Sequence, residues 1–262
     1  MFQHSAVTES ERALPDTQTT QLATVIRSYL PPHQDRDAEL LDMGAGLGRQ
    51  VVELGKLSEA QLGRGVKWTC YEPAFGSRLR ERLEGWPNVT VVETLEAIPK
   101  RQFDICVLAN VLHEVTPPEF LQLLTVADAQ LSPTGVLAIL ELFPLIHPER
   151  YAVAYDATTL ADILRAAGLV ADIAQIPLRG PGVTAYCVIA RRLACDRAFD
   201  PAAAKQAIDE AWVKILERAL SSYAALGRPV DADSYQRLLS LLTTIASIES
   251  WKAGMWLPRA NP

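Results

Sequence analysis

Short apolar runs alternate with helix-forming segments as far as about residue 193. Runs of about six to eight residues suit strands that are buried on both faces, as in a parallel sheet. Their alternation with helices indicates a doubly wound α/β fold. The expected strands are 38–43, 66–72, 88–93, 103–110, 135–142, 169–176 and 182–192. The expected helices are 17–30, 47–57, 76–85, 117–131 and 158–168.

The connection between the last two expected strands is the short segment PLRGPG (177–182). A parallel neighbour needs a crossover of a dozen or more residues, so this connection is too short for one. We therefore predict a seven-stranded, mostly parallel sheet whose last strand runs antiparallel to its neighbour.

Beyond the last strand the sequence indicates a helical hairpin. Two long helices are expected at 199–226 and 231–256, and Gly227 and Pro229 break them at the turn. Three interpretations of this extension stay open: a hairpin packed on the main domain, a lid over the substrate, and a surface for dimerisation or another protein contact. The chain thus divides into a polar N-terminal arm (1–16), an α/β domain (17–193) and a helical C-terminal extension (194–262).

The composition narrows the function classes. A net charge of −6 argues against sequence-blind binding to nucleic acid. No apolar run reaches the roughly 18–20 residues of a membrane span, and the acidic start is unlike a secretory signal. Cys70, Cys106 and Cys187 fall in expected strands, where a thiol is usually an inert hydrophobe, and Cys195 shows no metal-type pairing. We expect a cytoplasmic protein with no metal site.

A glycine-rich turn follows the first expected strand, in the stretch LLDMGAGLGRQ (40–50). Such a turn lets a ligand approach the main chain closely, and it aims the first N–H groups of the next helix at negative charge. A dinucleotide site prefers G-x-G-x-x-G, but Arg49 stands where the third glycine would fall. Asp42 ends the strand, where open α/β sheets place ligands, and a carboxylate suits a cationic amine better than a pyrophosphate. S-adenosylmethionine carries an amine, a carboxylate and a sulfonium but no phosphate, so it is the expected cofactor.

The stretch D42-M-G44-A-G46-L-G48 resembles the first motif of the class I S-adenosylmethionine-dependent methyltransferases, and the resemblance covers about 17–193. It continues in WTCYEP, where the family's second strand ends in an acid that holds both ribose hydroxyls. Glu72 stands there, and a carboxylate can accept two hydrogen bonds from a diol. FDICVLANVLHEV and LSPTGVLAILEL are similar to the family's fourth motif and fifth strand.

The resemblance implies a set of cofactor-binding residues, including those of the turn after the third strand that lies beside adenine. Other roles stay open for three of them: Asp42 could cap the next helix, Glu72 could be solvated, and Glu93 could lie on the surface. The expected cofactor-binding residues are Asp42, Gly44, Ala45, Gly46, Gly48, Glu72, Glu93, Thr94 and Asn110.

Methyl transfer from a sulfonium is an in-line displacement, so the protein mainly has to align the acceptor, and a general base is optional. The acceptor should lie over the carboxyl ends of the fourth and fifth strands. His113 is the best candidate for the base because it closely follows the fourth strand and a histidine can take a proton near neutral pH; a structural role is also open. Glu141, near the end of the fifth strand, is the second catalytic candidate, and a structural hydrogen-bonding role is open for it as well. Further polar residues in this region are Asn110, Glu114, His147, Tyr151 and Tyr155.

The sequence disfavours several acceptors. Members of the family that methylate nucleobase amino groups usually carry Asn/Asp-Pro-Pro-aromatic at the fourth strand, whereas residues 109–112 read ANVL. No Pro-Cys pair follows that strand, and the acids for a catechol-type magnesium site are missing. What remains is an oxygen, nitrogen or carbon atom of a small molecule, or of a protein or RNA side group. The acidic net charge and the apolar and aromatic segment 143–155 favour the small molecule.

The leading hypothesis is an S-adenosylmethionine-dependent methyltransferase that acts on an unidentified, small acceptor. The alternative is a non-catalytic S-adenosylmethionine-binding sensor or the partner subunit of an assembly. A third hypothesis, a nicotinamide-dependent oxidoreductase, is disfavoured by Arg49 and Asp42.

Overall fold

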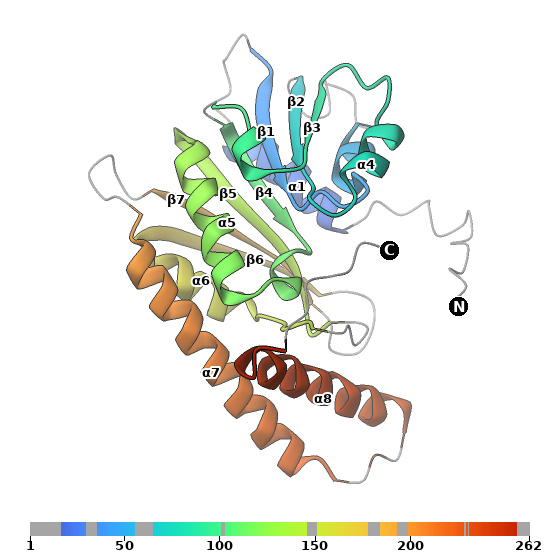
Figure 1. Cartoon of the computed structure of the whole chain (residues 1–262), viewed down its shortest axis with the longest axis vertical. Coiled ribbons are helices and arrows are strands. Elements are labelled where there is room, and N and C mark those ends of the chain that lie inside the picture. The colour runs from blue at the N-terminus through green and yellow to red at the C-terminus, as the bar shows by residue number, and fades with distance from the viewer. Residues whose placement is uncertain are drawn as a thin grey trace.

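The computed structural model describes residues 17–29, 36–55, 65–100, 103–145, 151–177, 184–192, 199–227, 229 and 231–255. Its centre is a seven-stranded sheet in the order β3-β2-β1-β4-β5-β7-β6 (Figure 1). The strands are β1 (Ala38–Met43), β2 (Val66–Tyr71), β3 (Val89–Val92), β4 (Phe103–Ala109), β5 (Leu131–Phe143), β6 (Leu169–Pro177) and β7 (Thr184–Arg192).

The strand directions confirm the predicted fold class. β1 pairs in parallel with β2 and β4, β2 with β3, and β4 with β5. β7 inserts between β5 and β6 and runs antiparallel to both. The carboxyl ends of the parallel strands therefore share one edge of the sheet, and the predicted site residues gather there.

Helices cover both faces of the sheet (Figure 1). Successive residues of a strand point to opposite faces, so Leu40 and Cys70 enter one hydrophobic cluster while Leu41 and Met43 enter the other. The first cluster holds α1 (Thr17–Tyr29), α2 (Arg49–Leu54) and α4 (Gly76–Arg82); the second holds α5 (Pro117–Gln130), α6 (Ala157–Ala166) and α7 (Pro201–Ala225). Two short 3₁₀ helices, η2 (Leu95–Ala97) and η3 (Leu112–Glu114), were not expected from the sequence.

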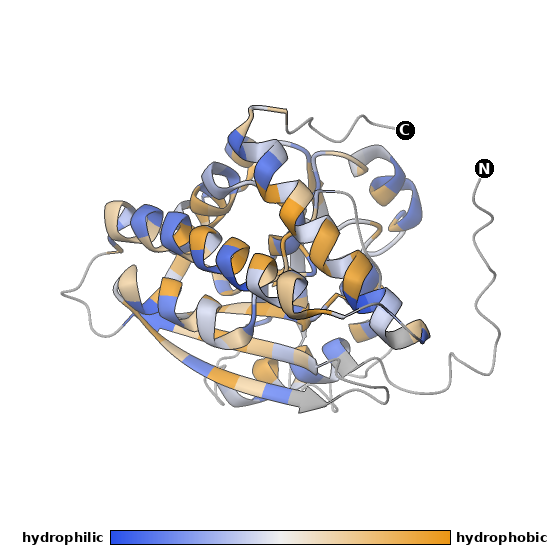
Figure 2. Ribbon diagram, turned by 90° about the horizontal axis from the view of Figure 1, so that it is seen from below, coloured by the Kyte–Doolittle hydropathy of each residue, from blue (hydrophilic) through white to orange (hydrophobic). Residues whose placement is uncertain are grey.

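The helical extension shares the core of the α/β domain. Ile208, Trp212 and Ile215 of α7 lie in the same hydrophobic cluster as the sheet face. α8 (Ala232–Lys252) returns along α7 and adds Ile248 to that cluster. Figure 2 views this hairpin from below, with hydrophobic residues running along α8. These contacts favour the packed hairpin among the three interpretations of the extension.

Most predicted boundaries lie within one to four residues of the observed ones; for example, α4 and α8 end earlier than expected, at Arg82 and Lys252. Two of the differences have a clear structural cause. α2 begins at Arg49 rather than 47, because Gly48 is in the left-handed conformation at its N-cap. β5 begins at Leu131 rather than 135, because Leu131 pairs with Phe103 ahead of a register shift in the β4–β5 ladder. The arm 1–16, His147 and Cys195 lie outside the described residues. Among the helices described, none combines the length and apolar character that crossing a membrane requires.

Candidate active site

The glycine turn between β1 and α2 leaves the main chain accessible at Gly46. Gly44, Gly46 and Gly48 all have positive φ, at 83°, 54° and 74°. A side-chain carbon on Gly46 would meet no atom within 4 Å, so its backbone is accessible to a ligand. A side-chain carbon on Gly44 would lie 2.7 Å from a methyl of Val111, so this glycine packs against the chain that follows β4.

Glu72 lies beside this turn, as the sequence predicts. Its side chain is buried at the carboxyl end of β2. One oxygen, Oε2, accepts the N–H of Gly46 at 2.6 Å, and Oε1 accepts the N–H groups of Ala74 and Phe75 at 2.9 and 3.1 Å. These bonds fix the carboxylate against the glycine turn and leave Oε2 with capacity for a further donor.

Asp42 is the most unusual group of the turn. Its side chain is only 2% exposed, and no described residue donates a hydrogen bond to its carboxylate. Burial, and then the negative charge of Glu72, raise the pKa of Asp42 to about 7. A buried carboxylate without a donor is costly unless it is neutralised or paired. A cationic group placed next to Asp42 would remove that cost.

The two residues predicted beside adenine lie at the exposed end of β3. Glu93 forms an ion pair with Arg80 of α4 at 2.5 Å, with both side chains about half exposed. Thr94 is exposed at the N-cap of η2. The ion pair favours the surface alternative for Glu93.

Asn110 directly follows β4 and is in the left-handed conformation, with φ at 58°. Its side-chain amide exchanges two hydrogen bonds of 2.8 Å with the amide of Gln18 in α1. Arg49 donates to the same Gln18 oxygen at 2.7 Å, so Gln18 joins the glycine turn to the end of β4. Sequence reasoning missed Gln18. The feature that could have indicated it is that Gln18 and Thr19 are polar residues on the buried face of α1.

His113 and Glu141, the two catalytic candidates, are brought together by the fold. Nδ1 of His113 lies 2.7 Å from Oε2 of Glu141, and both side chains are buried. The other oxygen of Glu141 accepts the backbone N–H groups of Val111 and Leu112 at 2.9 and 2.8 Å. Since a carboxylate only accepts, we assign the ring proton to Nδ1, which makes Nε2 the basic nitrogen. Glu114 lies 3.7 Å from Nε2.

The glycine turn and the histidine–glutamate pair are neighbours. Val111 packs against Gly44, its own N–H is held by Glu141, and His113 follows two residues later. The two predicted parts of the site thus meet through one residue. Tyr155, by contrast, points into the core, where its hydroxyl accepts a hydrogen bond from Trp212.

Comparison with known proteins rests on structure. No family model matches the sequence, and no curated protein matches it significantly. A 1,6-didemethyltoxoflavin-N1-methyltransferase from Burkholderia thailandensis, solved with 1,6-didemethyltoxoflavin and S-adenosylhomocysteine bound, is 20% identical over 70% of this chain and 81% of that chain, with a TM-score of 0.52. The CMeT domain of the citrinin polyketide synthase is 20% identical over 66% of this chain and 52% of that chain, also at 0.52.

The chain has the fold of the class I S-adenosylmethionine-dependent methyltransferases. This confirms the resemblance that the glycine motif and the later motifs indicated. At 20% identity the similarity establishes the fold, and the chemistry has to be argued from the residues of the site.

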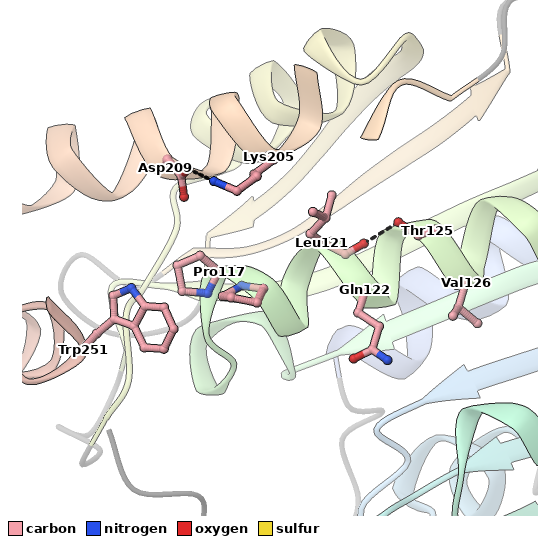
Figure 3. Close-up of a pocket in the computed structure, with 9 residues that line it drawn as sticks. Pro117, Leu121, Gln122, Thr125, Val126, Lys205, Asp209 and Trp251 are labelled. Atoms are coloured by element: carbon pink, nitrogen blue, oxygen red, sulfur yellow. Dashed lines mark hydrogen bonds and ion pairs between the residues drawn. The ribbon is translucent and has the colours of Figure 1, made fainter. Parts of the chain in front are cut away.

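A groove of about 430 Å³ lies on the outer side of this fold, between α5, α7 and α8 (Figure 3). Pro117, Leu121 and Trp251 make it mainly apolar, and Lys205 and Asp209 form an ion pair at its rim, 2.6 Å apart. None of the predicted site residues lines it. Within the described residues no group of three or more His, Cys, Asp or Glu side chains could hold a metal ion.

Proposed function

We propose that this chain is an S-adenosylmethionine-dependent methyltransferase acting on a small molecule. The observation that carries the proposal is the buried carboxylate of Asp42, which has no donor among the described residues, beside the open backbone of Gly46. S-adenosylmethionine has an amine that can pair with the Asp42 carboxylate, and it has no phosphate that this carboxylate would repel. The methyltransferase fold, and the S-adenosylhomocysteine held by the Burkholderia structure, support the same cofactor.

Each of the proposed cofactor-binding residues would contact a different part of S-adenosylmethionine. Asp42 would pair with the amine, and the backbone of the turn from Gly44 to Gly48, including Ala45, would lie along the ligand. Glu72 would accept a ribose hydroxyl on Oε2 in addition to the N–H of Gly46. Asn110 would border the methionine part. Thr94 lies at the strand end where the adenine is expected, and Glu93 is the weakest member because Arg80 already pairs with it.

The cofactor supplies a methyl group that is already activated for in-line displacement. His113 would take the proton of the acceptor on Nε2. Glu141 holds the ring through Nδ1 and would stabilise the imidazolium, as would Glu114 at 3.7 Å. A residue pair built for proton removal favours an acceptor that must lose a proton to react, such as a hydroxyl group. It also favours catalysis over the non-catalytic sensor role.

A small acceptor is favoured by the net charge of −6 and by the substrate of the Burkholderia neighbour, which is a small heterocycle. The three described cysteines are free and buried in strands, which suits the reducing cytoplasm.

The test is transfer of a labelled methyl group from S-adenosylmethionine to a pool of small hydroxylated and aminated aromatic compounds. We expect one class of compound to take up the label with the wild-type chain and to lose nearly all of it with H113Q. Tight cofactor binding with no transfer to any pool would favour the sensor role instead.

For the extension we propose contact with a second copy of this chain. Tyr235, Leu239 and Leu242 are 55%, 38% and 41% exposed on one stripe of α8, which continues to the exposed Ala246. Residues 238–248 carry no charge. In an antiparallel pair, the Leu242 side chains of the two copies would meet. The neighbouring layer of the stripe would then place Leu239 of one copy near Ala246 of the other, a large side chain against a small one. Sedimentation should give a dimer that L239E/L242E converts to a monomer, and a monomeric wild-type chain would refute the contact.

A further inference from the structure

The segment from Tyr151 to Asp156 leads into α6 and is hydrogen-bonded to the backbone of the candidate base. The N–H of Val153 donates to the carbonyl oxygen of His113 at 2.8 Å, and the side chain of Val153 is fully buried. A shift of this segment would therefore move the backbone that carries the imidazole.

Tyr155 anchors this segment to the α/β domain. Its carbonyl oxygen accepts the hydroxyl of Tyr186 in β7 at 2.6 Å. Its ring packs edge-on against Phe120 of α5, with the ring centres 5.5 Å apart. Burial raises the pKa of the Tyr155 phenol well above its ordinary value, so the hydroxyl stays neutral.

The extension adds two further anchors, and they differ in burial. Trp212 of α7 donates its indole N–H to the hydroxyl of Tyr155 at 2.5 Å, and both side chains are buried. Arg218, further along α7, pairs with Asp156 at 2.9 Å, but its side chain is 57% exposed. An exposed ion pair contributes little, whereas a buried hydrogen bond is costly to break. The Trp212 bond is the anchor that matters.

We propose that Trp212 is a positioning residue for His113. It acts through Tyr155 and Val153, so an element outside the α/β sheet sets the geometry of the base. The indole is itself held in place, because it lies edge-on to Trp251 of α8 with ring centres 6.3 Å apart. The helical extension thereby has a role in catalysis without touching the substrate. This inference rests on the proposed function for the role of His113, but its geometry can be tested without turnover.

The experiment compares three variants of the full chain. W212F keeps an aromatic ring and removes the N–H donor. R218A removes the exposed contact to the same segment. I215V trims a buried side chain of the same helix and lowers stability while leaving both hydrogen bonds from α7 to the segment in place. We measure kcat, KM for the acceptor, the affinity for S-adenosylhomocysteine, and the ¹⁵N shifts of the His113 ring, assigned with H113Q.

We expect W212F to lower kcat about tenfold, since small displacements of reacting groups are costly. KM and S-adenosylhomocysteine affinity should change less than about twofold, and R218A and I215V should retain the wild-type kcat. The ring shifts of His113 should move in W212F alone, because its Nδ1 proton is no longer held squarely towards Glu141.

Unchanged ring shifts in W212F would overturn the proposal, whether or not the wild-type chain transfers a methyl group. An equal fall of kcat in I215V would also overturn it, because the effect would then follow stability. If no methyl transfer is found at all but the ring shifts move as expected, the positioning holds and the proposed function fails.

Discussion

Asp42 and Glu141 are two buried carboxylates at the same edge of the sheet, and they differ in their hydrogen bonds. Each is 2% exposed. Glu141 is surrounded by the N–H groups of Val111 and Leu112 and the imidazole of His113. Asp42 has no donor among the described residues, and its pKa is raised to about 7.

The difference is that donors of the protein satisfy the carboxylate of Glu141, whereas the carboxylate of Asp42 has no donor among the described residues. On the proposed acceptor side, the carboxylate of Glu141 already holds the backbone after β4 and the imidazole of His113. On the proposed cofactor side, a cationic ligand would stabilise the buried carboxylate of Asp42. We therefore expect changes at the two carboxylates to have opposite effects on stability and separable effects on function.

The largest expected effect is on the acceptor side. H113Q removes the proposed base and should lower kcat by about 10²–10⁴-fold. S-adenosylhomocysteine affinity should stay within about twofold of wild type, because the residues proposed to bind the cofactor are unchanged. Steady-state kinetics and calorimetry measure the two quantities. A wild-type kcat in folded H113Q would remove His113 from the mechanism.

The next effect is on the cofactor side. D42N keeps the shape of the side chain but cannot pair with a cation. It should weaken S-adenosylhomocysteine binding at pH 8 by about 1.5–3 kcal/mol, or roughly 10- to 150-fold. E141Q is the matched control and should bind with near wild-type affinity. Equal losses in both variants would erase the distinction between the two carboxylates.

Stability should change with opposite signs. E141Q turns an amide N–H towards the Nδ1 proton of His113 and should lower the free energy of unfolding by about 1–3 kcal/mol. For Asp42 the folded pKa, about 7, lies above the ordinary 3.8. The wild-type chain therefore loses stability as the pH rises from about 4 to about 7, by about 1.4 kcal/mol for each pH unit.

D42N removes that loss, so it should be more stable than wild type at pH 8 and similar at pH 4. Urea unfolding at the two pH values makes the comparison. A D42N variant that is less stable than wild type at pH 8 would show that Asp42 has a donor in the free protein.

The contact between Gly44 and Val111, which joins the two sides of the site, can be tested with a pair of glycines. Gly44 and Gly85 have almost equal φ, at 83° and 84°. A side-chain carbon at Gly85 meets nothing within 4 Å, whereas at Gly44 it would collide with Val111. G44A should therefore cost about 1–3 kcal/mol more in the free energy of unfolding than G85A. It should also lower both cofactor affinity and kcat. Equal costs would mean that Val111 moves aside freely.

The smallest expected effect is the pH dependence of binding. A cationic amine needs the charged form of Asp42, and about half of it is protonated near pH 7. S-adenosylhomocysteine affinity should rise about tenfold between pH 6 and pH 8, and D42N should lack this rise. A flat profile in the wild-type chain would separate Asp42 from the amine.

The arrangement of Glu72 beside the glycine turn could be expected from the sequence, because these residues lie close together in the chain. Asp42, the glycines and Glu72 lie within one strand–turn–helix–strand unit, and Glu72 accepts a hydrogen bond from a glycine only 26 residues away. The fold was equally readable from the length and order of the apolar runs. The start of β5 was missed because Pro133 and Thr134 read as a turn, while pairing with β4 decides the strand.

The acceptor side could be predicted only in part, because its contacts join distant segments. His113 and Glu141 were identified singly, but nothing in the sequence pairs them. Gln18 and Asn110 are 92 residues apart, and Trp212 and Tyr155 are 57 apart. Such pairs depend on how helices dock on the sheet, which no local pattern encodes.

The central claim is that the glycine turn with Asp42 binds S-adenosylmethionine through its amine. Calorimetric titration of the full chain at pH 8 with S-adenosylhomocysteine tests it most directly, beside 5′-methylthioadenosine, which lacks the amine and the carboxylate, and a nicotinamide dinucleotide. We predict micromolar binding of S-adenosylhomocysteine, much weaker binding of 5′-methylthioadenosine, and none of the dinucleotide. Binding of the dinucleotide alone, or of no ligand at all, would contradict the account.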